Sequence, residues 1–173
     1  MGLHASYFPI DPERLARIAA ILHTFEGAVE INTFRRESDA RGEEFYIGTR
    51  WHVLDFLINP PGLAIPELAY AVRGRAFAGP DGTVEEGPHL PSYDDELWQV
   101  FTYVSAAEVA VISPLLSVLT PADFEARYEP RVMQHLYRAP SELDPYDLEV
   151  AAQFQRFYRA MADAGKAIFI SIG

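Results

Sequence analysis

The chain has 173 residues, of which 49% are hydrophobic and 13% aromatic, and this is enough for one compact domain with a hydrophobic core, which we place over residues 1–173. The lack of cysteine excludes disulfides, thiolate zinc sites, iron–sulfur clusters and a cysteine nucleophile, and it fits a reducing compartment, so we expect a cytoplasmic protein. The formal net charge of −11 disfavours nucleic acid as a partner, and no apolar run reaches the ~18 residues that a membrane span needs.

The chain is predicted to begin with a strand that leads into a helix. Residues 6–10 are aromatic and aliphatic, and they are followed by Asp11 and Pro12, a pair in which Asp can cap a helix and Pro can occupy its first turn. The helix has an apolar stripe at helical spacing, formed by Leu15, Ile18, Ala19 and Leu22. Residues 30–44 are charged and weakly periodic, which predicts a loop with at most a short turn of helix.

A second strand and a short apolar helix are predicted next. Residues 45–47 are typical of a strand, and residues 51–58 form an apolar run. A Pro-Pro-Gly sequence ends this run, because proline cannot continue a helix and glycine tolerates the turn. Pro66 predicts the start of another short helix, which ends at Gly74.

The second half of the chain has a clear strand and three helix starts. Residues 98–104 are rich in β-branched and aromatic side chains, which favours a strand. Ser105 and Glu108 match a capping box, so a helix is expected to follow at once. Pro114 lies inside this helix and predicts a kink or a break. Thr120 precedes a proline and predicts the start of the next helix.

The last helix and the last strand are the best specified elements. The helix is predicted to begin near Asp144, and its apolar side comprises Leu148, Ala151, Phe154, Phe157, Tyr158 and Met161. Residues 167–172 then form an apolar strand that we expect to lie inside a sheet. The order of elements predicts an α+β fold, a single compact domain with a small mixed β-sheet of about four strands packed with five to seven helices.

Several features occur in one order along almost the whole chain. They are Met1-Gly2 before an aromatic strand, Arg50-Trp51 followed by Leu54, Phe56 and Leu57, then Pro66 with Ala71-Val72 and Gly74, and finally Tyr158-Arg159-Ala160-Met161 with Gly165 and an aliphatic strand. In this order and spacing, they resemble the YfbM-like family of small bacterial domains of unknown function.

The chain departs from the pattern of this family at two places. The family often has an acidic residue and a lysine before the tryptophan, where this chain has Gly48-Thr49-Arg50, so no role of that lysine carries over. The family also tends to have a Gly-Pro turn where this chain has Leu97-Trp98-Gln99. The resemblance implies the fold and a bacterial origin, but it supplies no catalytic residues, since the family has no established activity.

One short helix carries the candidate site. At about 3.6 residues per turn, His52, Asp55 and Asn59 lie on one side of this helix, next to Trp51. The Asp55 carboxylate can orient the His52 imidazole and raise its pKa, as a general base requires, so these two are the candidate catalytic residues. Arg50, Trp51 and Asn59 are the candidate ligand-binding residues. The alternative is a structural His–Asp pair that satisfies its own hydrogen bonds beside a core tryptophan.

A second His–acid pair raises the question of a metal site. His23 and Glu26 have the same spacing as His52 and Asp55. Two imidazoles and two carboxylates would suit a divalent metal if the two pairs met in space. The sequence does not bring them together, so we assign no metal and no other cofactor.

Strong catalytic signatures are lacking: the chain has no nucleophile elbow, dinucleotide-binding glycine motif, P-loop or His-Glu-x-x-His motif. We therefore interpret the protein as a binding or interaction module for a protein partner or a small regulator. No Lys or Arg occurs between Arg75 and Arg127, so a basic protein is one possible partner and a solvated acidic surface is the alternative. The rival hypothesis is a hydrolase-type enzyme that uses His52 and Asp55 in a cleft near Trp51. The oligomeric state is left open.

Overall fold

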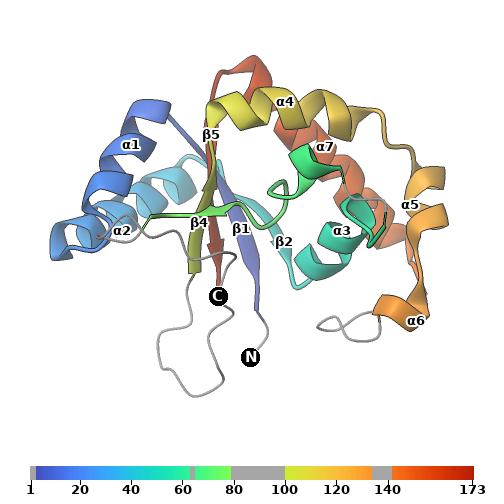
Figure 1. Ribbon diagram of the computed structural model, residues 1–173. Coiled ribbons are helices and arrows are strands. Elements are labelled where there is room, and N and C mark those ends of the chain that lie inside the picture. Colours follow the sequence, from blue (N-terminus) through green and yellow to red (C-terminus); the bar gives the residue numbers. More distant parts are fainter. Residues whose placement is uncertain (1–2, 63–64, 79–99, 134–141) are drawn as a thin grey trace.

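The strands lie in the first part, the middle and the end of the chain, with helices between them, as Figure 1 shows for the computed structural model, which describes residues 3–62, 65–78, 100–133 and 142–173. In chain order the elements are β1 (Ala5–Ile10), α1 (Pro12–Ile21), α2 (Phe25–Ala40), β2 (Phe45–Gly48), α3 (Trp51–Ile58), the 3₁₀ helix η1 (Pro66–Leu68), β3 (Arg75–Ala76), β4 (Val100–Val104), α4 (Ala106–Ser117), α5 (Pro121–Arg127), α6 (Pro130–Met133), α7 (Pro145–Asp163) and β5 (Ala167–Ile172). Within these residues there are seven α-helices, and the predicted α+β class is confirmed.

The sheet has five strands in the order β2-β1-β5-β4-β3, and each neighbouring pair among the described residues is antiparallel. The prediction of about four strands in a mixed sheet was therefore wrong in these two details. The additional strand is β3, whose two residues are too few to produce a sequence pattern. Strand direction is set by contacts between distant segments, such as Ala5 opposite Ile172, and a local pattern does not contain it.

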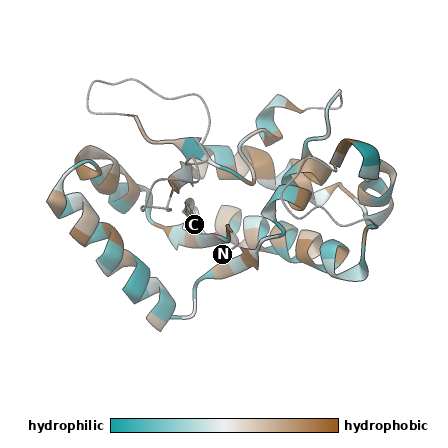
Figure 2. Ribbon diagram, turned by 90° about the horizontal axis from the view of Figure 1, so that it is seen from below, coloured by the Kyte–Doolittle hydropathy of each residue, from teal (hydrophilic) through white to brown (hydrophobic). Residues whose placement is uncertain are grey.

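Two hydrophobic cores lie on opposite faces of the sheet. Along β5 the side chains alternate between them, with Ile168 and Ile170 in one core and Phe169 in the other. Helices α1 and α2 cover one face, and α3, α4 and α7 cover the other (Figure 1). In Figure 2 these helices carry both hydrophobic and hydrophilic residues, as expected of helices with one buried and one exposed side. All six residues of β5 are buried, which confirms the prediction that this strand lies inside the sheet.

Helix α2 replaces most of the loop that was predicted for residues 30–44. Thr24 caps the helix, because its hydroxyl accepts a hydrogen bond from the Gly27 backbone N–H at 3.0 Å. The four buried positions, Gly27, Ile31, Phe34 and Ser38, do follow helical spacing. Only Ile31 and Phe34 are large hydrophobic residues. The apolar periodicity is therefore weak, and packing of the helix on α1 and the sheet decides its conformation.

The predicted helix starts at Ser105, Thr120 and Asp144 are confirmed by their caps. Asp11 is the N-cap residue of α1 as predicted, but its side chain makes no cap hydrogen bond. Capping boxes are present at Ser105, Thr120 and Asp144, where each cap side chain accepts a backbone N–H three residues later. The break predicted at Pro114 is not found, since α4 continues to Ser117. Pro114 lies on the exposed side of the helix, where the backbone carbonyl that its ring leaves unbonded can be hydrated.

Helix α4 is apolar on its exposed side as well as on its buried side. Val111 and the C-cap residue Val118 are exposed, and no charged residue occurs between Glu108 and Asp123. Within the described parts of the chain, no single helix is long and apolar enough to cross a membrane, and α4 and α5 meet that criterion only together, with a bend of 90° between them.

Candidate functional site

The predicted site helix α3 is buried almost all round. Most of its residues are apolar, and seven of its eight residues are buried, including Trp51 and His52. The indole N–H of Trp51 donates a hydrogen bond to the backbone carbonyl of Leu3 at 3.3 Å, so this ring belongs to the core. The His52 side is also closed, since this residue is only 6% exposed. The helix therefore serves mainly to fill the core against the sheet and α7.

Asp55 is paired with an arginine that the sequence analysis did not single out. Arg73 Nε lies 2.6 Å from Asp55 Oδ2, and the guanidinium carbon lies 5.7 Å from the centre of the Trp51 ring. The side chain of Asp55 is 14% exposed and that of Arg73 is 36% exposed, so the pair is at the edge of the core. Arg73 is 18 residues from Asp55 in the sequence, and no local spacing could have indicated the contact.

The electrostatics around His52 are the reverse of those that a general base needs. Burial, with a contribution from the positive charge of Arg73, lowers the pKa of His52 from 6.5 to about 4. The prediction that Asp55 raises this pKa was therefore wrong. Burial also raises the pKa of Asp55, against the opposing effect of Arg73. At neutral pH the imidazole is uncharged and a weak base, which is poorly suited to general base catalysis.

Arg73 is held in place by hydrogen bonds to the backbone around it. Four side chains donate to carbonyls of this segment: Asn59 to Leu68 at 2.7 Å, Tyr158 to Ala71 at 2.6 Å, Tyr7 to Val72 at 2.7 Å and Thr102 to Arg73 at 2.5 Å. Burial holds the pKa of Tyr7 and of Tyr158 well above its ordinary value, so both phenols stay protonated and remain donors. The amide of Asn59, a predicted ligand-binding group, is used in this way to fix the fold.

Arg50 has a similar structural position at the other end of α3. Its guanidinium lies 3.2 Å from Asp144 and 3.1 Å from Asp147, the cap and third residue of α7. The ring of Tyr146 lies 5.7 Å from the guanidinium carbon. Arg50 therefore connects the start of α3 to the start of α7, and its charge is neutralised by these two carboxylates.

The two His–acid pairs lie on opposite faces of the sheet. His52 belongs to α3, whereas His23 and Glu26 lie where α1 passes into α2, on the other face (Figure 1). His23 Nε2 is hydrogen-bonded to the Ala78 carbonyl at 3.0 Å. In the part of the chain that the structure describes, no group of three or more His, Cys, Asp and Glu side chains is arranged to hold a metal ion. The pairs are therefore not brought together.

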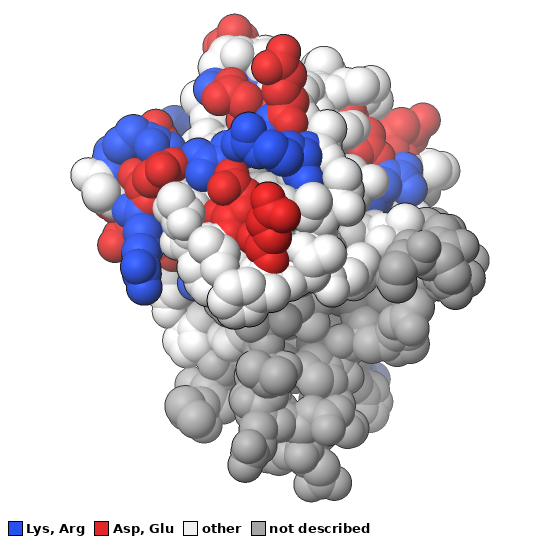
Figure 3. Space-filling view, turned by 90° about the vertical axis from the view of Figure 1, so that its left-hand side faces the viewer, with Lys and Arg blue, Asp and Glu red and all other residues white. Residues whose placement is uncertain are grey.

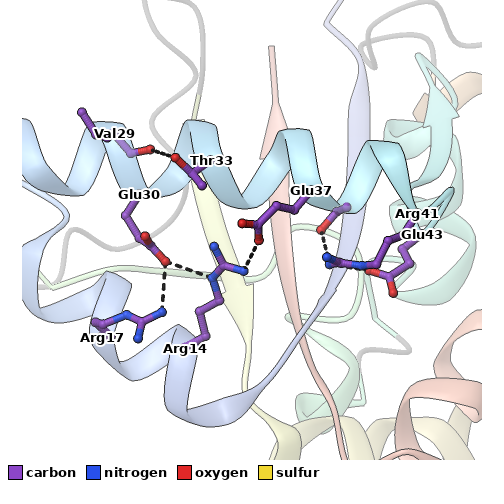
Figure 4. Close-up of polar contacts among 9 residues, drawn as sticks. Arg14, Arg17, Val29, Glu30, Thr33, Glu37, Arg41 and Glu43 are labelled. Carbon is purple, nitrogen blue, oxygen red and sulfur yellow. Dashed lines mark hydrogen bonds and ion pairs between the residues drawn. The ribbon is translucent and has the colours of Figure 1, made fainter.

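Charged side chains gather instead on the side of the molecule formed by α1 and α2 (Figure 3). On the side of α2 that faces α1, these charges form ion pairs (Figure 4). Arg14 lies between two carboxylates, 2.9 Å from Glu30 and 2.6 Å from Glu37, and Arg17 lies 3.1 Å from Glu30. These contacts join α1 to α2 along the line where the helices meet.

A cavity of about 330 Å³ lies on another side of α2, and we call it the α2 cavity. Its lining residues come from α2, from β1 and from the residue before β2: Phe8, Asn32, Arg35, Arg36, Asp39 and Glu44. The four α2 residues are three, one and three positions apart, which places them on one side of the helix. Two other cavities of similar size are described, and none of these three is lined by His52.

The charged groups of the α2 cavity are not paired with one another. Within the described residues, neither Arg35 nor Arg36 forms an ion pair, and the carboxylates of Asp39 and Glu44 do not form one either. The Nε atom of Arg35 is buried without a hydrogen-bond partner, and its guanidinium carbon lies 6.0 Å from the centre of the Phe8 ring. A buried donor that makes no hydrogen bond is costly, so this N–H is a hydrogen-bond donor without an acceptor among the described residues.

The α2 cavity was not predicted, because the sequence pattern of residues 30–44 indicates a loop. Once residues 25–40 are a helix, Asn32, Arg35, Arg36 and Asp39 fall on one side of it, and helical spacing alone could have shown this. The contribution of Phe8 could not have been found, because it depends on how α2 packs on β1.

Comparisons with known proteins identify a family but no activity. A family model described as a domain of unknown function, DUF1877, matches residues 1–171. Among solved structures, the chain is similar to the crystal structure of YfbM, a protein of unknown function from Escherichia coli, with a TM-score of 0.59 and 15% sequence identity over 98% of this chain and 99% of that chain. At this identity the similarity shows the fold alone. No curated protein matches the chain.

Proposed function

Since this chain belongs to the DUF1877 family, whose function is unknown, we propose a function from its own side chains: it binds a small polar molecule in the α2 cavity. This is the small-ligand form of the binding role that the sequence analysis predicted. The protein then works by recognition of this molecule, and no chemical step is required of it.

The observation that carries the proposal is the unpaired state of the charges in the α2 cavity. Arg14 and Arg17, on α1, have carboxylate partners on α2 between 2.6 and 3.1 Å away. Arg35 and Arg36 have no such partner among the described residues, although Asp39 is four or three positions away on the same helix. A concave site with several convergent polar groups is the usual form of a small-molecule site, and its volume of about 330 Å³ lies at the lower end of the range for such sites.

The hydrolase-type alternative has weaker support. A reacting group has to meet its substrate, but His52 is 6% exposed and lines none of the three cavities described above. Asp55 makes its ion pair with Arg73. These observations favour structural roles for His52 and Asp55 and leave the binding proposal as the better one.

A protein partner, the exclusion of nucleic acid and a cytoplasmic location are predictions from composition and charge. A protein partner is the other form of the binding hypothesis, and the exclusion of nucleic acid rests on the net charge of −11. A cytoplasmic location rests on the lack of cysteine and is likewise a prediction.

Titration with small polar compounds, followed by NMR, tests the proposal. The panel contains carboxylates, phosphates, amines, zwitterions and sugars, and the signals to follow are the side-chain amide of Asn32 and the backbone amides of α2. We expect at least one class to shift these signals saturably. Arg36→Gln should weaken that binding at least tenfold, because Arg36 lines the cavity and is exposed.

Arg17→Gln is the matched control for this experiment. Arg17 is also an exposed arginine on the α1–α2 side of the molecule, but it is paired with Glu30 and does not line the cavity. Its substitution should leave the affinity unchanged. If no compound shifts the Asn32 signal, or if both variants weaken binding equally, the proposal is wrong.

A further inference from the structure

We infer that the ligand of the α2 cavity is a small zwitterion of the amino-acid type, with a carboxylate bound by Arg35 and Arg36 and an ammonium group bound by Asp39 and Glu44. This inference rests on the proposed function and specifies the chemical class of its ligand. The two pairs of charged side chains and the direction of α2 carry it.

The positive and negative groups of the cavity are separated along α2. Arg35 and Arg36 are adjacent near the middle of the second half of the helix, and Asp39 follows three to four residues later. At ~1.5 Å rise per residue, the origin of the Asp39 side chain is about 5 Å further along the helix axis than those of the arginines. Glu44 comes after the end of the helix, beyond Ala40. The cavity therefore has a cationic part and an anionic part, one helical turn apart.

The helix dipole has the same direction as this separation. The C-terminal end of α2, at Ala40, carries partial negative charge because its last backbone carbonyls have no helical partner. Asp39 and Glu44 lie at this end, so the dipole adds to their attraction for a cation. The arginines lie further from the end, where the dipole has little effect and their own charges decide the binding of an anion.

A zwitterion fits this arrangement better than a ligand with one charge. The lining has two formal positive and two formal negative charges, so its net charge is zero. A simple anion would be attracted by the arginines and repelled by Asp39 and Glu44, and a simple amine would experience the reverse. A molecule with both groups meets an opposite charge at each end, and the guanidinium groups suit a carboxylate by geometry as well as by charge.

The other lining groups agree with a small, polar molecule. The amide of Asn32 can donate and accept, so it can bind either end of the ligand. Phe8 supplies the apolar part of the lining and is itself 98% buried, with 2% of its surface exposed. The volume of about 330 Å³ leaves space for one such molecule and for water around it.

The inference is tested with four probes of similar size: β-alanine, propionate, propylamine and inorganic phosphate. The full chain is titrated with each probe, and the side-chain amide of Asn32 is followed by NMR. We expect β-alanine to bind at least tenfold more tightly than propionate and than propylamine, because each of these lacks one of the two charge contacts. Phosphate should bind no better than propionate, since it faces the same two carboxylates.

Two substitutions assign the ends of the ligand. Arg36→Gln should weaken the binding of propionate and β-alanine but not that of propylamine. Asp39→Asn should weaken the binding of propylamine and β-alanine but not that of propionate. Both side chains are exposed, so both variants should fold, which their thermal unfolding will verify. Arg17→Gln again serves as the control, which should leave the affinity for all four probes unchanged.

The outcomes separate this inference from the proposed function. If propionate or phosphate binds as tightly as β-alanine, the zwitterion is wrong, although a small ligand still binds in the cavity. If none of the four probes shifts the Asn32 signal but a compound of the wider panel that is not a zwitterion does, the zwitterion is likewise wrong. If no compound of either set does so, both statements are wrong.

Discussion

The polar side chains around α3 and those around the α2 cavity lie on opposite faces of one sheet and are in opposite states. Around α3, Asp55 is bound to Arg73, Asn59 to the Leu68 carbonyl and Arg50 to two carboxylates of α7. Around the α2 cavity, the two arginines and the two carboxylates are not paired within the described residues. The first set holds elements together, whereas the second set remains available to a ligand.

The difference shows that a conspicuous group of polar residues in a sequence can be engaged in contacts that hold the fold together. His and Asp are conspicuous on an apolar helix because polar residues are rare there. A buried polar side chain, however, has to form hydrogen bonds or ion pairs with its neighbours, and its polar atoms are then no longer available to a ligand. Charged residues on a polar helix, in contrast, do not stand out in a sequence as a candidate site. Their state is decided by tertiary packing, which pairs Arg14 and leaves Arg36 unpaired.

The largest effect on stability is expected from a substitution that distorts the backbone segment next to Arg73. Gly74 has φ +68°, and a Cβ atom there would lie 2.7 Å from Thr102 Oγ1 and 2.9 Å from Ile170 Cδ1. Gly74→Ala should therefore lower the free energy of unfolding by about 3 kcal/mol, through backbone strain and overlap. Gly165→Ala is the control, since Gly165 has φ +64° and nothing within 4 Å, and only the strain of about 1 kcal/mol applies. Urea unfolding measures both, and equal losses would contradict the close contact.

The next largest effect is expected from removal of the Arg73 charge. Arg73→Gln leaves the Asp55 carboxylate, 14% exposed, without its partner and should lower the free energy of unfolding by about 2 kcal/mol. Asp55→Asn in the same chain removes the unpaired charge, so the double variant should regain about half of this loss. Urea unfolding of the single and double variants is the measurement. A single variant as stable as the wild type would mean that the pair is not structural.

A smaller effect concerns pH. The unfolded chain binds a proton at His52 below its ordinary pKa of 6.5, whereas the folded chain does so only near a pKa of about 4, so this group makes the fold less stable as the pH falls from 6.5 to about 4. The expected loss is on the order of 1–2 kcal/mol.

His52→Gln should remove this contribution, and the free energy of unfolding should then fall less between pH 6.5 and pH 4 than it does in the wild type. The opposing contribution of Asp55, whose pKa is raised, is present in both chains and cancels in the difference. Urea unfolding at several pH values gives the two slopes. Identical slopes would show that the His52 imidazole is in contact with water.

The smallest effects compare the paired Arg14 of α1 with the unpaired Arg36 of α2. Arg14→Gln removes two ion pairs of a side chain that is 21% exposed and should cost about 1 kcal/mol of unfolding free energy. Arg36→Gln removes no pair and should change this free energy by less than about 0.5 kcal/mol. Thermal unfolding at low salt is sensitive enough to detect the loss of stability caused by Arg14→Gln, and 1 M salt should make this loss smaller. If Arg36→Gln costs as much as Arg14→Gln, the cavity charges are structural.

The elements with strong local signals could be predicted from the sequence. The strands β1, β2 and β5, the helices α1, α3 and α7, the capping box at Ser105 and the helix start at Thr120 follow from apolar spacing and cap residues, which act within a few positions. Helix α2 could not be predicted in this way. Its buried face includes Gly27 and Ser38, and it is stabilised by contacts with α1 and the sheet.

The site could be predicted only as far as its residues are neighbours in sequence. The burial of Trp51 and the position of His52 beside it follow from the apolar character of α3. The pairing of Asp55 with Arg73 spans 18 residues, and the contact between Phe8 and the α2 cavity depends on the packing of a helix on a strand. Contacts of this kind are set by the tertiary fold, and single-sequence patterns do not report them.

The central position of β5 has a consequence for how the protein is made. β5 lies between β1 and β4, and its pairing with β1 joins Ala5 to Ile172. While the ribosome is still adding residues before Ala167, β1 can pair only with β2, and the inner edges of β1 and β4 have no neighbour. The nascent chain therefore exposes one strand edge once β1 is made and a second once β4 is made, and chaperone binding would be most useful between the synthesis of β4 and that of β5.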